Sequence, residues 1–374
     1  MAGRHHPDTL CDIARMDHAL PAPCGIVPPH LLERLARSGG AAPAEAARRT
    51  LETDARLRTA RRLDPAHRAR AAGDAGDGGD GGDGGTARRT LYDAGNRTLL
   101  PGVRVRSEGG EPVADACVNR VHAGLGATAA LLHEVYGRRS LDGAGLPLEA
   151  SVHYGEGYAN ASWDGRRLVL GDGDGEVFGD FTAAVDVIAH ELAHGLTQHS
   201  AGLAHFGQPG ALNESVSDVV GSLVKQRVLG QGAEEADWLV GAGLLGPRVP
   251  GAALRSLRAP GTAYDDALLG ADPQPATMAG YVRTPRDNGG VHINSGIPNH
   301  AFYLLATRLG GPAWERAGRI WLDVLTGGRL HRDADFAAFA RLTAAAAAER
   351  YGRGEEHDAV LKAWSQVGVD PGAR

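Results

Sequence analysis

The sequence has little cysteine, little lysine and no long apolar run. The three cysteines, Cys11, Cys24 and Cys117, stand at unrelated spacings, so they describe neither a disulfide framework nor a CxxC metal site. No apolar run approaches the roughly 20 residues of a membrane span, and the first 20 residues lack the apolar segment of an ordinary signal peptide. We therefore expect no membrane span, and either a cytoplasmic location or secretion by a non-classical route.

Lysine occurs only twice, at Lys225 and Lys362, so arginine supplies almost all of the positive charge. The formal net charge is −6 and no basic stripe results, which argues against a nucleic-acid partner. The 374 residues are 43% hydrophobic and 22% charged, as in ordinary soluble globular proteins. A chain of this length can hold two or three domains and bury a sizeable core.

The first 90 residues differ from the rest of the chain. Residues 26–32 form an apolar cluster with a Pro pair and lead into a short helical pattern, and residues 44–72 have the periodicity of a solvated amphipathic helix. Residues 73–85 contain only Gly, Asp and one Ala, and so predict a flexible linker. Their Asp-Gly repeats lack the twelfth-position Glu of an EF-hand loop and do not indicate a calcium site.

Beyond the linker, strand patterns come before helical ones. Short alternating runs predict strands within 88–118 and 151–180, and apolar spacing predicts a helix at 116–136. Further helices are predicted at 185–200, 212–229, 298–309, 313–326, 335–351 and 355–367. This order favours an α+β fold with segregated halves.

A His-Glu-x-x-His run lies in the helix predicted at 185–200. His190 and His194 are four residues apart, so on a helix they share one face and can direct ring nitrogens at one metal ion. Glu191 projects beside them, where it could take a proton from a metal-activated water. Because two surface histidines can flank a Glu by chance, the hypothesis of a zinc hydrolase depends on finding further ligands.

A catalytic zinc takes three protein ligands and leaves one position open. The class whose extended motif ends in a third His is excluded, because Thr197 and Ser200 occupy the positions of its Gly and His, and His199 is one residue out of register. The other class takes a Glu from the following helix, and Glu214 fits that position. Asp218 lies one turn later on the same face, where it is a natural hydrogen-bond partner for a ligating histidine.

The third cluster of polar residues spans 287–296. A Gly pair amid Asp, Asn and His describes a loop whose backbone approaches something closely. His292 could stabilise an oxyanion there, with Asp287 holding it in its protonated form. Taken alone, the same residues would also suit a turn with an exposed histidine.

Together these groups resemble the thermolysin-like neutral metalloproteases, in order and in separation. The likeness covers roughly residues 90–368. It includes His190-Glu191-x-x-His194, Asn213-Glu214-x-x-Ser217-Asp218, Asp287-Asn288-Gly289-Gly290-Val291-His292, Ser151-Val152-His153-Tyr154, Asn160-Ala161-x-Trp163 and Gly171-Asp172-Gly173-Asp174-Gly175.

The resemblance implies a zinc-dependent endopeptidase with one catalytic zinc, acting on proteins and peptides. His190, His194 and Glu214 would bind the zinc, Glu191 would be the general base, and His292 would steady the oxyanion. The supporting residues would be Asp218 and Asp287, and the substrate would contact Asn160, Ala161 and Arg255. An apolar pocket that prefers a bulky hydrophobic residue after the scissile bond would be lined by Phe178, Phe181, Val187 and Leu254.

One departure from the family concerns the oxyanion. His205 stands where the family usually has a Tyr that helps to stabilise it. A histidine can still donate a hydrogen bond, but its charge depends on pH near neutrality. We therefore expect activity to persist with an altered acid limb, which a pH–rate comparison with His205→Tyr would test.

A second departure concerns calcium. Asp186 matches an acid of the paired calcium site of the family, whereas Lys225 replaces a key acid on the next helix. Because a cation there repels Ca²⁺, we expect the double site to be missing and leave one weaker calcium site open.

The Val27-Pro28-Pro29 sequence and the short preceding segment resemble the protealysin branch, in which a short propeptide covers the active site. This implies an inhibitory propeptide at 1–72, a linker and processing region at 73–88 near Arg88-Arg89, a β-rich lobe at 89–205 and a helical lobe at 206–374. For Cys24, a thiolate bound at the open zinc position and a small apolar residue beside the Pro pair are alternative interpretations.

Two other functions share part of this pattern. A one-zinc aminopeptidase has the same ligand geometry but needs an acidic loop ahead of the motif for the free amine, and no clear equivalent precedes His190. A catalytically silent protein that keeps zinc for folding or partner binding would have no use for Glu191.

Overall fold

The computed structural model describes residues 25–63 and 88–372. Cys24 and the linker predicted at 73–85 lie outside the described residues, so the predictions made for them are not addressed by the fold.

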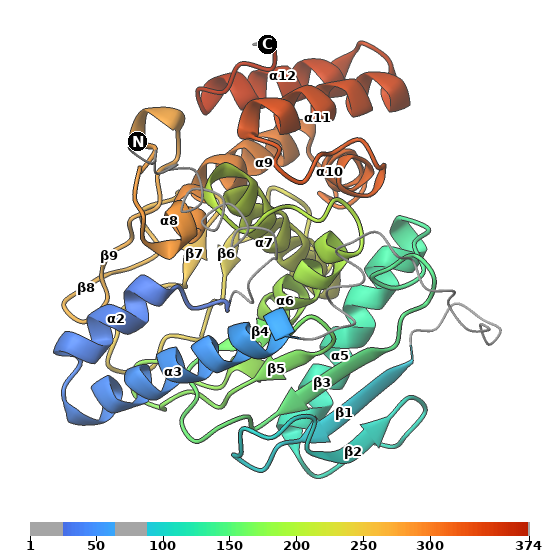
Figure 1. Cartoon of the computed structure of the whole chain (residues 1–374). Coiled ribbons are helices and arrows are strands. Elements are labelled where there is room, and N and C mark those ends of the chain that lie inside the picture. The colour runs from blue at the N-terminus through green and yellow to red at the C-terminus, as the bar shows by residue number, and fades with distance from the viewer. Residues whose placement is uncertain (1–24, 64–87, 373–374) are drawn as a thin grey trace, which may run out of the picture.

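A five-stranded sheet forms the base of the molecule (Figure 1). Its order is β2-β1-β3-β5-β4; β1 runs parallel to β3 and β3 to β5, whereas the two outer pairs are antiparallel. Its strands are β1 (Arg89–Asp93), β2 (Val103–Ser107), β3 (Leu148–Val152), β4 (Ala161–Trp163) and β5 (Leu168–Leu170). Every residue of β4 and β5 is buried, because helices cover both faces of the sheet at this side.

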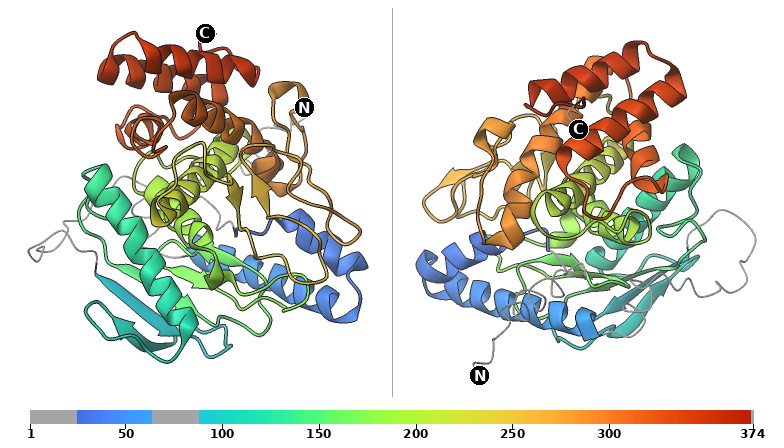
Figure 2. Two further views of the ribbon diagram at one scale, coloured as in Figure 1. Left: turned by 180° about the vertical axis from the view of Figure 1, so that it is seen from behind. Right: turned by 45° about the horizontal axis from the view of Figure 1, so that its top comes forward.

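Helix α5 (Ala116–Ala130), continued by a π turn at Leu131–Val135, packs against the sheet (Figure 2). The Asp115 carboxylate caps its first turn by accepting from the backbone N–H of Cys117.

Two central helices follow the short 3-10 turn Phe181–Ala183. In helix α6 (Val185–Gln198) nearly every residue is buried, because the helix lies between the sheet and helix α7 (Gly207–Leu229). The start of α7 was predicted at residue 212. The helix begins five residues earlier because Pro209 falls in its first turn, where the missing N–H costs no helical hydrogen bond.

The C-terminal part is mostly helical, with helices stacked around a core in which the rings of Trp321 and Trp364 lie parallel, 5.7 Å apart between centroids. These helices are α8 (Asp287–Asn294), α9 (Gly296–Leu309), α10 (Ala317–Thr326), α11 (Phe336–Tyr351) and α12 (Glu355–Gln366). Between α7 and α8 lie the paired strands β6 (Leu239–Val240) and β7 (Arg255–Ser256), the pair β8 (Asp265–Asp266) and β9 (Gly270–Ala271), and a 3-10 turn, Met278–Gly280.

The prediction of a loop at 287–296 was wrong in part. The segment forms the short helix α8, but its first four residues, Asp287, Asn288, Gly289 and Gly290, all have positive φ. Glycine adopts this conformation without strain and Asn tolerates it, so the Gly pair marks a change of direction inside the helix.

The N-terminal helices α2 (Pro29–Ser38) and α3 (Ala41–Leu63) lie along the β4 side of the sheet (Figure 1). The buried residues of α3 recur at the spacing of one helical face, and they include Ala47, Thr50, Asp54, Leu57 and Arg61. Just before α2, Gly25 forms an antiparallel bridge with Ser162, so the chain pairs with the outer edge of β4.

The α+β prediction, with a β-rich lobe followed by a helical lobe, is confirmed. Within the described residues, no helix is both long enough and apolar enough to cross a membrane.

Candidate active site

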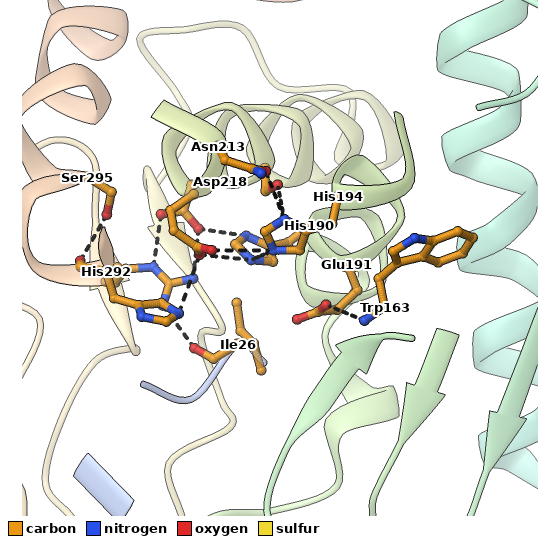
Figure 3. A network of polar contacts seen from close by, with 12 residues as sticks. Ile26, Trp163, His190, Glu191, His194, Asn213, Asp218, His292 and Ser295 are labelled. Atoms are coloured by element: carbon orange, nitrogen blue, oxygen red, sulfur yellow. Dashed lines mark hydrogen bonds and ion pairs between the residues drawn. The ribbon is translucent and has the colours of Figure 1, made fainter. Parts of the chain in front are cut away.

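Two imidazoles meet on the buried face of α6. The Nε2 atoms of His190 and His194 are 3.2 Å apart, as their four-residue spacing predicts (Figure 3). Helix α7 adds Glu214, whose Oε2 lies 3.6 Å from His190 Nε2 and whose Oε1 lies 3.6 Å from His194 Nε2. The three predicted zinc ligands, His190, His194 and Glu214, therefore converge on one point.

The dimensions of this triangle suit a zinc ion. Zinc with bonds of about 2.0–2.1 Å in a tetrahedral site places its ligand atoms about 3.3 Å apart. Both carboxylate oxygens of Glu214 are buried without a hydrogen-bond donor, which a bound cation would compensate. The residues therefore fit a zinc held by three protein ligands.

The other nitrogen of each imidazole is also held. His190 Nδ1 lies 2.9 Å from Asp218 Oδ1, and His194 Nδ1 lies 3.0 Å from Asn213 Oδ1. Polar contacts of this kind at Nδ1 orient each ring so that its Nε2 faces the position of the metal. Sequence reasoning found Asp218 but assigned no role to Asn213, although it directly precedes Glu214.

Electrostatics keep His194 and Glu214 in the forms that bind a metal ion. Burial lowers the pKa of His194 to about 3, so its ring is neutral. Burial alone would raise the pKa of Glu214, but four surrounding histidines outweigh it and lower the pKa to about 2. Neutral imidazole and ionised carboxylate are the states that bind metal ions.

Glu191 lies beside the two imidazoles, and its ligand atom is within 4.8 Å of theirs. Its Oε2 accepts from the backbone N–H of Trp163 at 2.9 Å. Burial, and then the charge of Glu214, raise the pKa of Glu191 well above its usual value. A carboxylate with a raised pKa is a better proton acceptor at neutral pH.

The left-handed turn in α8 brings His292 to the same centre. Its Nδ1 lies 2.5 Å from Asp287 Oδ1, and its Nε2 lies 3.5 Å from Glu214 Oε2. Burial alone would lower the pKa of His292, but Asp287 and Glu214 outweigh it and raise the pKa to about 9. The ring is therefore protonated at neutral pH and presents an N–H to the site.

His205 also reaches the site, from the segment between α6 and α7. Its Nε2 lies 3.7 Å from Glu214 Oε1, and its ring centroid lies 6.5 Å from that of His292. The sequence suggested a charge that changes near neutrality. Burial instead lowers the pKa of His205 to about 4, so the ring is uncharged at neutral pH.

Arg255 connects the metal ligands to the N-terminal segment. Its guanidinium makes two hydrogen bonds to Asp218, of 2.9 and 2.8 Å, and its Nη1 donates to the Ile26 carbonyl at 2.9 Å. Asn299 Nδ2 donates to the same Asp218 carboxylate at 2.8 Å. These contacts outweigh burial and hold the pKa of Asp218 well below its usual range.

Asn160 and Ala161, predicted to hold a substrate main chain, hold residues 26 and 27. The Ile26 N–H donates to the Ala161 carbonyl at 3.0 Å, and the Val27 N–H donates to Asn160 Oδ1 at 2.9 Å. Ile26 is fully buried, within the same continuous apolar core as the predicted pocket residues. Those residues are Phe178, Phe181, Val187 and Leu254.

Comparison with known proteins identifies the family. The model of the thermolysin metallopeptidase catalytic domain matches residues 86–198, and that of the thermolysin metallopeptidase alpha-helical domain matches residues 201–369. The chain belongs to the thermolysin metallopeptidase family. It is therefore a metalloendopeptidase, and the zinc dependence of the family agrees with the ligand geometry.

Relatives of this metallopeptidase match most of its length. An extracellular metalloprotease of Pectobacterium carotovorum subsp. carotovorum is 47% identical over 93% of this chain and 96% of its own. Protease PrtS of Photorhabdus sp. (strain Az29) is 49% identical over 76% of this chain and 77% of its own. The structure of the precursor of protealysin from Serratia proteamaculans is 48% identical, with a TM-score of 0.83, over 92% of this chain and 99% of that one.

Lys225 of this metallopeptidase lies in a cage of oxygen atoms. Its Nζ is 2.7 Å from Asp237 Oδ2, 3.1 Å from the Leu239 carbonyl and 3.6 Å from Asp186 Oδ2. The backbone N–H of Gly241 donates a hydrogen bond to Asp186 Oδ2. The ammonium group thus stands among carboxylate and carbonyl oxygens of the kind that bind calcium.

Asp54 is a buried carboxylate that sequence reasoning missed. Its Oδ1 accepts from Tyr158 Oη at 2.7 Å, and its Oδ2 accepts from Asn160 Nδ2 at 3.1 Å. Burial raises the pKa of Asp54 to about 6, and the hydrogen bonds and the charge of Arg58 offset this only in part. The helix carries many other charged residues, so nothing in the sequence separates Asp54 from the exposed charges around it.

We predict that Asp54 makes the stability of the precursor pH-dependent. Between about pH 4 and pH 6 the folded protein binds the proton that the unfolded chain releases, so stability falls as pH rises through this window. The change in the free energy of unfolding across this window is on the order of 2–3 kcal/mol.

Urea unfolding of a Glu191→Ala precursor, which cannot digest itself, should show this fall in stability with pH, and Asp54→Asn should flatten it. Glu52→Gln, on an exposed part of α3, is the matched control, and an equal slope in Asp54→Asn would contradict the prediction.

Proposed function

We propose that the chain is the self-inhibited precursor of a zinc-dependent neutral endopeptidase. The observation that carries this proposal is the segment 25–27, which lies across the site and takes up the groups expected to bind a substrate. The Ile26 backbone pairs with Ala161 and Arg255, and Val27 pairs with Asn160. While this segment is in place, a protein substrate cannot reach these groups.

A zinc ion bound by His190, His194 and Glu214 would supply a Lewis acid that activates water and polarises the scissile carbonyl. Glu191 takes a proton from the attacking water at its carboxylate and passes it to the leaving amine. His292 donates from Nε2 to the oxygen that gains charge, and Asp287 keeps that ring protonated. The neutral His205 can add a second donor near the same oxygen.

We infer a preference for a bulky aliphatic or aromatic residue after the scissile bond. Ile26 supports this inference, because its main chain follows the expected substrate contacts while its side chain is fully buried in the apolar core that contains Phe178 and Leu254. A Phe or Leu at that position should gain about 1.5–3 kcal/mol from burial relative to an exposed side chain. Charged residues should be cleaved poorly there.

The path of residues 25–27 favours an endopeptidase over an aminopeptidase. Ile26 contributes a peptide N–H rather than a free amine, and the chain before it continues along β4 through the bridge between Gly25 and Ser162. The site therefore accepts chain on both sides of the bond. The silent zinc-protein alternative still gives no use for Glu191.

We propose that the chain consists of a propeptide at 1–72, a linker at 73–88, a β-rich lobe at 89–205 and a helical lobe at 206–374. Relatives named extracellular support secretion over a cytoplasmic location. The latency role of Cys24 rests on residues outside the described part of the chain, and Cys24→Ser would test it.

The test of this function is proteolysis by purified protein. The zinc-loaded chain should gain activity on casein as residues 1 to about 88 are removed, lose it to 1,10-phenanthroline and regain it with zinc. Peptides with Leu or Asp after the scissile bond provide the specificity test. Failure to cleave casein after removal of the N-terminal segment would refute the proposed function.

Calcium gives a separate prediction. Because the Lys225 ammonium already neutralises Asp186 and Asp237, millimolar Ca²⁺ should leave the melting temperature of the metal-free Glu191→Ala precursor unchanged. Lys225→Glu removes the cation and adds oxygen ligands, so its melting temperature should rise with calcium. Lys362→Glu, on an exposed helix surface, should show no response. Stabilisation of the unsubstituted protein by calcium would show that a functional calcium site remains.

A further inference from the structure

We propose that the precursor presents its own Gly25–Ile26 peptide bond to the active site and cleaves that bond within the same molecule. This inference rests on the proposed function and adds to it one specific bond and an order of events.

The register of the segment is the first support. Ile26 is held at both its N–H and its carbonyl, by Ala161 at 3.0 Å and by Arg255 at 2.9 Å. The Val27 N–H donates to Asn160 Oδ1 at 2.9 Å, and Asn160 Nδ2 donates to the Val27 carbonyl at 3.4 Å. Four directional hydrogen bonds on two successive residues fix both the position and the direction of the chain.

The position of Glu191 is the second support. Its Oε2 accepts from the backbone N–H of Trp163 at 2.9 Å, and Trp163 lies two residues along β4 from Ala161, whose carbonyl accepts from the Ile26 N–H. The carbonyl carbon of Gly25 is one C–N bond, about 1.33 Å, from that same Ile26 nitrogen. The peptide bond beside the general base is therefore Gly25–Ile26.

Gly25 itself is the third support. A Cβ atom at this residue would lie 2.3 Å from Asn160 Nδ2, so only glycine permits this approach without displacing Asn160. Because Gly25 also bridges to Ser162, the chain is held on both sides of the bond. Holding a bond in this way removes most of the entropy cost of bringing it to the catalytic groups.

The order of events follows from the sheet. Arg89, near the predicted processing region, begins β1, which is separated from β4 by β3 and β5. At about 4.8 Å per strand, that is roughly 14 Å from the edge where residues 25–27 lie. While Ile26 fills the site, cleavage near Arg89 needs a second molecule, whereas cleavage at Gly25–Ile26 does not.

The step is a hydrolysis with water as co-reactant. The water oxygen bonds to the Gly25 carbonyl carbon, and Glu191 accepts one of the water protons. The C–N bond then breaks, Glu191 returns the proton to the Ile26 nitrogen, and the products are a Gly25 carboxylate and an Ile26 amine. The second product remains seated by its contacts with Arg255 and Asn160.

The experiment follows zinc addition to full-length, metal-free precursor at several protein concentrations, by intact mass and N-terminal sequencing. The first product should begin at Ile26, with a rate constant that does not depend on protein concentration. Fragments cut after residue 72 should appear after the Ile26 product, and their rate of formation should rise with protein concentration. Cleavage near Arg89 without any Ile26 N-terminus, in a protein that digests casein, would overturn this inference alone; absence of all cleavage, including that of casein, would overturn the proposed function.

A second readout needs no catalysis. In metal-free precursor, the amides of Ile26 and Val27 should be protected from hydrogen exchange. Gly25→Ala, which displaces Asn160, should remove that protection and slow cleavage at this bond about 100-fold. Gly354→Ala is the matched control, since a Cβ there meets nothing within 4 Å. Unprotected amides in the unsubstituted protein would contradict the proposed register.

Discussion

Glu191→Ala in the matured enzyme is expected to lower kcat/KM on casein and on peptide substrates by about 10³-fold or more. Loss of a positioned general base typically costs 10²- to 10⁴-fold, and here the same carboxylate both receives the proton and returns it to the leaving amine. Zinc content should stay at one per chain, because the three ligands and their partners Asp218 and Asn213 are untouched.

The matched control is Glu111→Ala, an exposed carboxylate on the β-rich lobe, which should retain full activity. Activity and bound zinc must be measured on the same sample, because a loss of metal would also lower activity. A variant that keeps both its zinc and its activity would show that another group moves the proton.

Arg255→Met is expected to have the largest effect on stability. It removes the guanidinium that makes two hydrogen bonds to the buried Asp218 carboxylate, and removal of one partner of a buried ion pair typically costs about 3–5 kcal/mol. The same change removes the hydrogen bond to the Ile26 carbonyl, so the N-terminal segment should also bind the site less tightly.

This prediction is checked by urea unfolding in the Glu191→Ala background, with and without Arg255→Met. Arg166→Met provides the control, because Arg166 is an exposed partner of Glu149 and such surface pairs contribute about 0–1 kcal/mol. A change in Arg255→Met no larger than that of Arg166→Met would mean that His190 and Asn299 alone are enough to stabilise Asp218.

The convergence of the proposed zinc ligands was predictable because it depends on short spacings within helices. His190 and His194 are one turn apart, as are Glu214 and Asp218, so local helix geometry is enough to place them on facing surfaces. The Gly pair at 289–290 indicated a close backbone approach, but not that the turn lies inside a helix. Local pattern cannot distinguish those two outcomes.

What could not be predicted depends on distant contacts. The hydrogen bond between Val27 and Asn160 joins residues that are 133 apart in the sequence. No local pattern shows which segment fills the site. The charge state of His205 was missed for a related reason: the sequence shows a histidine, whereas its pKa is set by complete burial among other groups. Asp54 lies on a helix that resembles a solvated one until its partners Tyr158 and Asn160 are known.

The ammonium group of Lys225 has a consequence for where the chain can fold. A bound ion is lost by dilution or to a chelator, and its contribution depends on its concentration in solution. A cation attached to the backbone by its own side chain is present at a fixed local concentration from synthesis onward. At this position, we therefore expect no penalty for folding in a compartment poor in free calcium, and no gain on later transfer to a calcium-rich one.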